Sequence, residues 1–205
     1  MTATYDYVFL TLERGLAARR AFLQGLAEAK ETIALSGGEV LGLFFPQLGW
    51  EAAEVALLVR WRGERDELSL EAVTGPPQVI GVRCDSLKPT LRPEDTAKLR
   101  PGGIYVHRWF ETPAPDLQEF LKLSGEGWQD FEPRFDVQVF GLFLADETED
   151  DQASRSRRLL LITRYADHGV WEASRNPSTE GMQIFARRAL ITLRTTGAST
   201  LFEPV

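Results

Sequence analysis

Residues able to carry acid–base or metal chemistry are scarce in this chain of 205 residues, which holds two histidines and one cysteine. Metal sites need clustered Cys and His ligands, and a nucleophilic triad needs a histidine beside its nucleophile. The chain also has no G-x-x-x-x-G-K-S/T loop, no G-x-G-x-x-G turn between a strand and a helix, and no G-x-S-x-G elbow. We therefore expect no metal site, no phosphate-binding loop of these kinds and no serine-hydrolase centre.

His107 is the candidate general base. It falls within an expected strand, between Val106 and Arg108, with Trp109 beside it. Neighbours on a strand point to opposite faces, so either His107 or Arg108 must point into any cavity that this strand lines. A cavity histidine can act as a base because its pKa lies near neutrality. A hydrogen-bonded structural histidine packed under a helix is the favoured alternative.

We expect no bound cofactor. Haem is a disfavoured alternative, and it would need His107 or His168 as the axial ligand. His168 follows Tyr165-Ala166-Asp167 at an expected helix start, where a surface or capping role is favoured over a functional one.

Two arginines, Arg60 and Arg164, lie in similar stretches, each followed by an aromatic residue. An unpaired guanidinium is costly to bury, so each should meet either a carboxylate of the protein or an anionic ligand. The structural salt bridge is favoured for both, and Arg108 presents the same choice. The ligand alternative would hold a carboxylate or carbonyl group. Its candidate residues are Arg60, Arg108, Trp109, Arg164 and Tyr165.

An acidic run covers residues 146–151, with the sequence DETEDD. It lacks the alternating ligand spacing and the following glycine of a calcium loop. A solvated hairpin tip is therefore favoured over a calcium site.

The elements that must position these residues occur twice. Tyr7-Val8 returns as Tyr105-Val106, 98 residues later, and the stretch V-L-G-L-F at 40–44 returns as V-F-G-L-F at 139–143. The stretch L-L-V-R-W at 57–61 returns as L-I-T-R-Y at 161–165. Collinear matches on a nearly constant offset indicate an internal repeat.

Each copy is expected to run strand, helix, strand, strand, helix, strand. The strands with the clearest aromatic and β-branched pattern are 7–12, 39–45 and 54–61 in the first copy, then 104–110, 136–144 and 158–165 in the second. The second helix of the first copy should be short, because Gly75-Pro76-Pro77 interrupts it. This order is the ferredoxin-like β-α-β-β-α-β unit.

A ferredoxin-like sheet has helices on one face and leaves the other face apolar, so that face must be covered. The second copy is the simplest cover. We predict an α+β fold in which two such units in tandem, residues 1–95 and 102–205, form a pseudo-dimer of the dimeric α/β barrel kind. Residues 93–103, rich in proline and glycine, would connect them.

The chain resembles the NIPSNAP family. The resemblance rests on Leu99-Arg100-Pro101-Gly102-Gly103-Ile104-Tyr105 above all, and on the later F-G-L-F at 140–143 and Arg164-Tyr165. It implies single or tandem units of the dimeric α+β barrel superfamily, with vesicle or mitochondrial roles and no agreed catalytic residues. The wider superfamily includes cofactor-free monooxygenases, isomerases and haem-handling proteins.

The composition of the chain argues against two classes of partner, nucleic acids and membranes. A net charge of −7 and a pI near 5.0 argue against nucleic-acid binding, which needs a basic face. No run of 18 apolar residues occurs, so we expect no membrane span. The single cysteine, Cys84, cannot form an internal disulfide, and the first residues lack signal-peptide character. We expect a cytoplasmic protein, with a homo-oligomer as one possibility.

Two functions stay open. The first is a barrel that binds a small hydrophobic or anionic ligand, or a protein partner, between or on its sheets. The alternative is a cofactor-independent monooxygenase or isomerase acting on a small aromatic or enolic substrate. That chemistry needs a dry pocket, a base such as His107, and an anion stabiliser such as Arg108 or Arg164.

Overall fold

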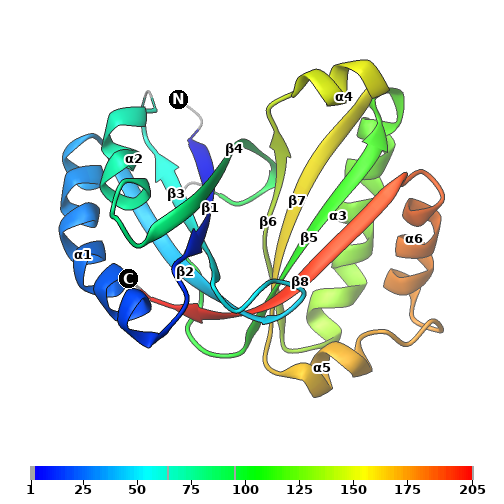
Figure 1. Ribbon diagram of the computed structural model, residues 1–205. Helices are drawn as coiled ribbons and strands as arrows, with labels where there is room; N and C mark the ends of the chain where they lie inside the picture. Colours follow the sequence, from blue (N-terminus) through cyan, green and yellow to red (C-terminus); the bar gives the residue numbers. More distant parts are fainter. Residues whose placement is uncertain (1–2, 64, 95, 205) are drawn as a thin grey trace.

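The computed structural model describes residues 3–63, 65–94 and 96–204 (Figure 1). The first half holds β1 (Thr4–Leu12), α1 (Leu16–Leu35), β2 (Gly38–Leu48), β3 (Glu54–Trp61), α2 (Glu67–Thr74) and β4 (Val79–Arg92). The second half holds β5 (Ile104–Pro113), the 3-10 turn η1 (Ala114–Asp116), α3 (Leu117–Arg134), β6 (Val137–Ala145), α4 (Glu149–Ser154), β7 (Ser156–Tyr165), α5 (His168–Ala173), α6 (Glu180–Ala189) and β8 (Arg194–Glu203).

The strands form one closed barrel in the order β1-β3-β2-β8-β5-β7-β6-β4. Each half gives its last strand to the other half: β4 pairs with β6, and β8 pairs with β2. The two halves therefore close on each other within one chain. This confirms the predicted α+β fold with a barrel built from two ferredoxin-like strand sets.

Alternation along each strand divides the apolar side chains into an inner core and two outer cores. Within the barrel, β4-β1-β3-β2 form the first sheet and β8-β5-β7-β6 form the second. The first outer core lies under α1 and α2, where Phe22, Leu26 and Ile33 of α1 pack on the first sheet. The second lies under α3 and α6 on the other side of the barrel (Figure 1). Between the sheets is the inner core, which is rich in aromatic rings.

The barrel opens at one end because two of its strand pairs are incomplete. Strand β4 pairs with β6 only from Leu87 onward, and β8 pairs with β2 only from Ser199 onward. Residues 79–86 of β4 and 194–198 of β8 therefore have a strand neighbour on one side alone. The sheets diverge there, and we call this opening the barrel mouth.

One expectation changed locally, and another was confirmed. The run 146–151 is no solvated hairpin tip throughout: Thr148 caps α4 in a capping box with Asp151, whose carboxylate is buried. Helix α2 is short, as predicted, and ends at Thr74 before Gly75. No helix among the described residues is long and apolar enough to cross a membrane.

Candidate functional site

His107 lies inside the barrel, in the inner core. Its side chain is 1% exposed, and its ring packs edge-on against Phe44, with 4.5 Å between ring centroids, and against Trp50 at 5.3 Å. The Nδ1 atom lies 2.9 Å from the hydroxyl oxygen of Tyr7. Nε2 is buried and has no hydrogen-bond partner among the described residues.

Burial sets the protonation of this pair. It lowers the pKa of His107 to about 3 and raises the pKa of Tyr7 well above its ordinary value. Near neutral pH the imidazole is thus uncharged and the phenol protonated. Tyr7 then donates its O–H to Nδ1, which assigns the imidazole proton to Nε2. A buried imidazole with so low a pKa is a poor general base.

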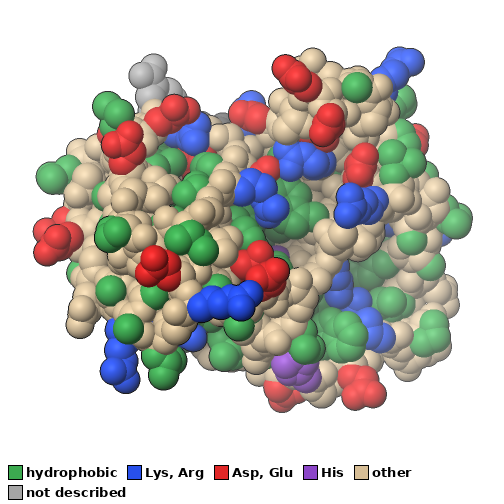
Figure 2. Space-filling model, viewed as in Figure 1, with side chains coloured by type: hydrophobic (Ala, Val, Ile, Leu, Met, Phe, Trp, Pro, Cys, Tyr) green, Lys and Arg blue, Asp and Glu red, His purple; other side chains and the backbone are tan. Residues whose placement is uncertain are grey.

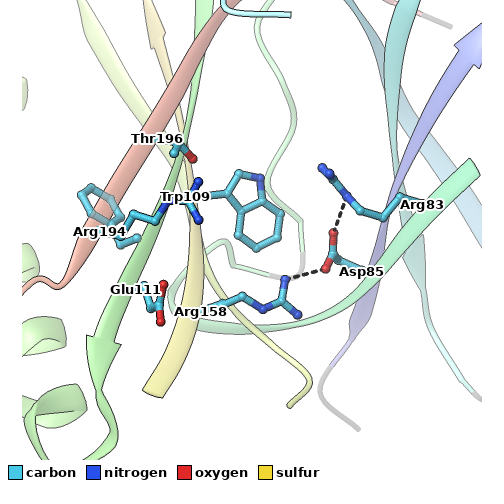
Figure 3. A pocket seen from close by; sticks show the side chains of 8 residues that line it. Arg83, Asp85, Trp109, Glu111, Arg158, Arg194 and Thr196 are labelled. Carbon is cyan, nitrogen blue, oxygen red and sulfur yellow. Dashed lines mark hydrogen bonds and ion pairs between the residues drawn. The ribbon is translucent and has the colours of Figure 1, made fainter. Parts of the chain in front are cut away.

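The mouth holds an open cavity of about 240 Å³, drawn in Figure 3. Residues from four strands line it, because β4 and β5 face each other across the opening while β7 and β8 flank β5. The lining residues are Arg83, Asp85, Trp109, Phe110, Glu111, Arg158, Arg194 and Thr196.

Asp85 joins the two sheets electrostatically across this cavity. Its carboxylate accepts from Arg158 Nη1 at 2.7 Å and lies 3.5 Å from Arg83 Nε (Figure 3). Arg158 Nε also donates to the buried Asp151 at 3.0 Å. Burial and the neighbouring carboxylates act on Arg158 in opposite directions. Burial lowers the pKa of Arg158, but the hydrogen bonds and charges of Asp85 and Asp151 outweigh it, so the pKa is raised. Arg83, Asp85, Arg158 and Asp151 are thus neutralised by one another.

Arg194 and Glu111 complete the cavity and stay available. They face each other in the β5–β8 register, yet neither forms an ion pair within 4 Å among the described residues. Trp109 lies between them and Asp85 (Figure 3), supported from beneath by Tyr7 at 5.9 Å between ring centroids. The cavity therefore offers one free cation, one free carboxylate and an indole face.

Two of the arginines predicted from the sequence lie at the opposite end of the barrel. Arg60 is 3% exposed, and its Nη2 contacts Glu39 Oε2 at 2.5 Å. Arg164 contacts Asp136 at 3.1 Å and donates to the carbonyl oxygen of Gly102 at 3.0 Å. Both therefore make the protein salt bridges that were the favoured interpretation.

Arg108 and Tyr165 lie on the outer face of the second sheet, away from His107. Tyr165 belongs to the outer core, and its hydroxyl accepts from Arg175 Nη2 at 3.1 Å. Arg108 sits between Val106 and Phe110, which also face the helices. The sheet thus separates His107 from Arg108, and only Trp109 among the predicted ligand residues lines the mouth.

The residues that the sequence reasoning missed come from β4, β5, β7 and β8. Asp85, Glu111, Arg158 and Arg194 carried no motif, and their proximity depends on how the two halves close. One local signal was readable: Thr148 and Asp151 have the spacing of a capping box, which orders the carboxylate that holds Arg158.

The histidines do not share a site. His168 is exposed at the start of α5, which agrees with the expected surface role, whereas the helix cap is Asp167 and not His168. Its Nε2 lies 3.4 Å from the hydroxyl of Ser199. Within the described part of the chain, no group of three His, Cys, Asp or Glu side chains could hold a metal ion.

No family model matches the sequence, and no curated protein matches it. Solved structures do match. A candidate chlorite dismutase superposes with a TM-score of 0.65 at 13% identity, covering 99% of this chain and 96% of the other. An anthrone oxidase-like protein gives 0.59 at 10% identity, covering 99% and 92%. An uncharacterised ferredoxin-fold protein from Listeria monocytogenes, related to antibiotic biosynthesis monooxygenases, gives 0.53 at 11% identity, covering 100% and 97%.

These likenesses extend over the whole chain and are low in identity, so they concern the fold. The chain has the ferredoxin-fold, dimeric α+β barrel architecture of those structures.

Proposed function

We propose that the protein binds a small aromatic anion in the barrel mouth, with a hydroxyl or similar donor beside the anionic group. The observation that carries the proposal is the free Arg194 in an open cavity walled by Trp109. An arginine fork suits a carboxylate, an indole suits an aromatic body, and Glu111 would accept from the ligand hydroxyl. Kinship with the NIPSNAP family belongs to the same proposal and rests on the sequence resemblance.

The burial of His107 and its hydrogen bond to Tyr7 favour a ligand-binding protein over an enzyme that uses His107 as its base. The cavity lining does not include His107, whose ring is closed off by Phe44, Trp50 and Tyr7. Of the two expected anion stabilisers, Arg108 lies behind the sheet, and Arg164 is paired with Asp136 at the opposite end of the barrel. The enzyme hypothesis in its original form therefore loses its base and its stabiliser together.

Calorimetric titration with 3-hydroxy-2-naphthoate tests the binding proposal. This planar ligand carries a carboxylate for Arg194 and a hydroxyl for Glu111. We expect Arg194→Gln to weaken binding about tenfold or more, the scale of one charge-assisted contact. Arg20→Gln, an exposed arginine on α1, is the matched control and should leave the affinity unchanged.

The ligand set separates the contributions of the two polar groups. 2-Naphthol lacks the carboxylate and should bind weakly, whereas 2-naphthoate lacks the hydroxyl and should lose only the Glu111 contact. Equal affinity of wild type and Arg194→Gln for 3-hydroxy-2-naphthoate would contradict the proposal.

A second candidate is oxidation of an enolisable aromatic ketone in the same cavity. Glu111 and Arg194 on adjacent strands could serve as base and enolate stabiliser, and one structural neighbour is an anthrone oxidase-like protein. One anthrone and one O₂ would give one anthraquinone and one water. An oxygen electrode should record uptake with anthrone that Glu111→Gln abolishes; uptake no faster than the spontaneous reaction would exclude this candidate.

A further inference from the structure

A second group of basic side chains lies on the opposite face of the same sheet. Arg108 of β5, Arg188 of α6 and Arg175, which follows α5, gather between the second sheet and its helices. None of the three forms an ion pair with a carboxylate of the described residues, although fourteen such pairs occur elsewhere in that part of the chain. We call these residues the arginine triad.

Arg188 is the most buried member, at 6% exposed. Its guanidinium carbon lies 4.7 to 5.1 Å from the ring centroids of Phe110, Phe120 and Phe185. Its one hydrogen bond to a described residue goes from Nη1 to the hydroxyl of Ser124, at 3.0 Å. Most of its five N–H donors are therefore left for something else.

Arg175 continues the same aromatic wall. Its guanidinium carbon lies 5.7 Å from the Phe131 and Trp171 centroids and 5.9 Å from that of Tyr165. Phe131 also contacts Phe185, with 5.6 Å between centroids, so the walls of Arg175 and Arg188 are continuous. The rings fix the guanidinium planes and bring no negative charge to them.

Arg108 completes the triad on the strand. Its guanidinium makes no hydrogen bond or ion pair with any described residue, and its side chain is half-buried. Opposite it in the register is Gly197 of β8, where an added Cβ would lie 3.5 Å from Arg108 Cγ. Gly197 and Thr195 are exposed, so no helix covers this part of β8.

The uncovered strand leaves an entrance. Viewed as in Figure 1, the space-filling surface shows a hollow between β8 and helices α5 and α6, with basic side chains set among hydrophobic ones (Figure 2). A ligand could reach the triad from this side, whereas the barrel mouth opens on the other face of β5.

The charges are close enough to oppose one another. Burial above all, together with the nearby charges of Arg108 and Arg175, lowers the pKa of Arg188 to about 9. Burial likewise lowers the pKa of Arg175, with a contribution from Arg108. Three mutually repelling cations are costly to maintain, and cation–π contacts offset only part of that cost. A bound anion would remove the repulsion.

We propose that the arginine triad is a second ligand site, which binds a multiply charged oxyanion of the phosphate-monoester class. Arginine forks fit phosphate oxygens bidentately. Three unpaired positive charges suit a dianion, whereas the mouth has one free cation set against one free carboxylate and suits a monoanion. The aromatic wall would accept an apolar group on the phosphate ester.

Phenyl phosphate at pH 8 tests this site, with phenyl sulfate as a probe of matched shape. A phosphate monoester is a dianion at that pH, and the sulfate ester carries one charge. Calorimetry of the full chain should give at least tenfold tighter binding of the phosphate. Arg188→Met should remove that binding, and Arg187→Met, the exposed neighbour on the same helix, should not.

Thermal unfolding of the unliganded variants shows whether Arg188 is there for stability instead. Replacing an unpaired buried cation by an apolar chain should leave the midpoint equal to or above that of wild type. Arg108→Gln repeats the binding test at a half-buried position, where folding is less at risk. Absent phosphate binding by wild type, undiminished binding by both variants, or a midpoint several degrees lower in Arg188→Met would each overturn the proposal. Arg194→Gln should keep phenyl phosphate affinity, which separates this site from the mouth.

Discussion

The buried imidazole of His107 should make the stability of the protein depend on pH. Its folded-state pKa is about 3, whereas an unfolded histidine titrates near 6.5. Between these values the unfolded chain binds a proton that the folded chain excludes. Stability is therefore fully present above pH 6.5 and falls as the pH decreases toward 3.

The magnitude follows from the two pKa values. At pH 5 the unfolded imidazole is mostly protonated and the folded one is neutral, so wild type loses about 2 kcal/mol relative to pH 7 through His107 alone. His107→Gln cannot titrate, and its side chain can still accept from Tyr7. The free energy of unfolding should thus fall by about 2 kcal/mol less in this variant between pH 7 and pH 5.

Urea denaturation of wild type and of His107→Gln at pH 7 and pH 5 measures how much unfolding free energy each protein loses between the two pH values. Carboxylates that titrate in the same interval contribute to both proteins and cancel. His168→Gln is the control, because that ring is exposed, and it should keep the wild-type pH dependence. An equal loss in wild type and His107→Gln would refute the buried, neutral state of His107.

Three further variants test the packing and backbone geometry of the barrel outside the two proposed sites. Asp6→Ala should lower the free energy of unfolding by about 3–5 kcal/mol. The buried carboxylate of Asp6 accepts from Trp61 Nε1 at 2.7 Å and from Arg65 Nε at 2.8 Å, and both bonds would be lost. A smaller loss in chemical denaturation would contradict this expectation. Gly103→Ala should cost about 2–4 kcal/mol, since φ is +81° and the new Cβ would lie 2.2 Å from a carbonyl oxygen. Gly102→Ala, with φ +73° and open space around it, should cost about 1 kcal/mol, and equal melting points for the two glycine variants would contradict this reading.

The fold could be predicted from the sequence because the hydrophobic pattern that specifies it is local and occurs twice. Strand 104–110 and strand 54–61 were placed to within a few residues, and the open apolar sheet face required a second sheet as its cover. Gly103, in the stretch that resembles the NIPSNAP family, shows one physical reason for that motif: its backbone passes too close to Tyr165 for a side chain.

The sites were less accessible to sequence reasoning. Alternation required that His107 and Arg108 face opposite sides, but nothing local assigned the inner side to His107. Asp85 and Arg158 are 73 residues apart, and their ion pair depends on the closing of two halves. In the sequence, Arg188 is one of two adjacent arginines. Only the packing of the helix shows that Arg188 is buried and that Arg187 is exposed.

Strand β5 separates the two proposed sites by its alternation. Trp109 and Glu111 face the mouth, and Arg108 faces the helices. A crystal structure with 3-hydroxy-2-naphthoate bound tests the central claim most directly. We predict density for its carboxylate within hydrogen-bond distance of the Arg194 guanidinium and for its rings against Trp109. An empty mouth at saturating ligand, or density confined to another surface, would contradict the account.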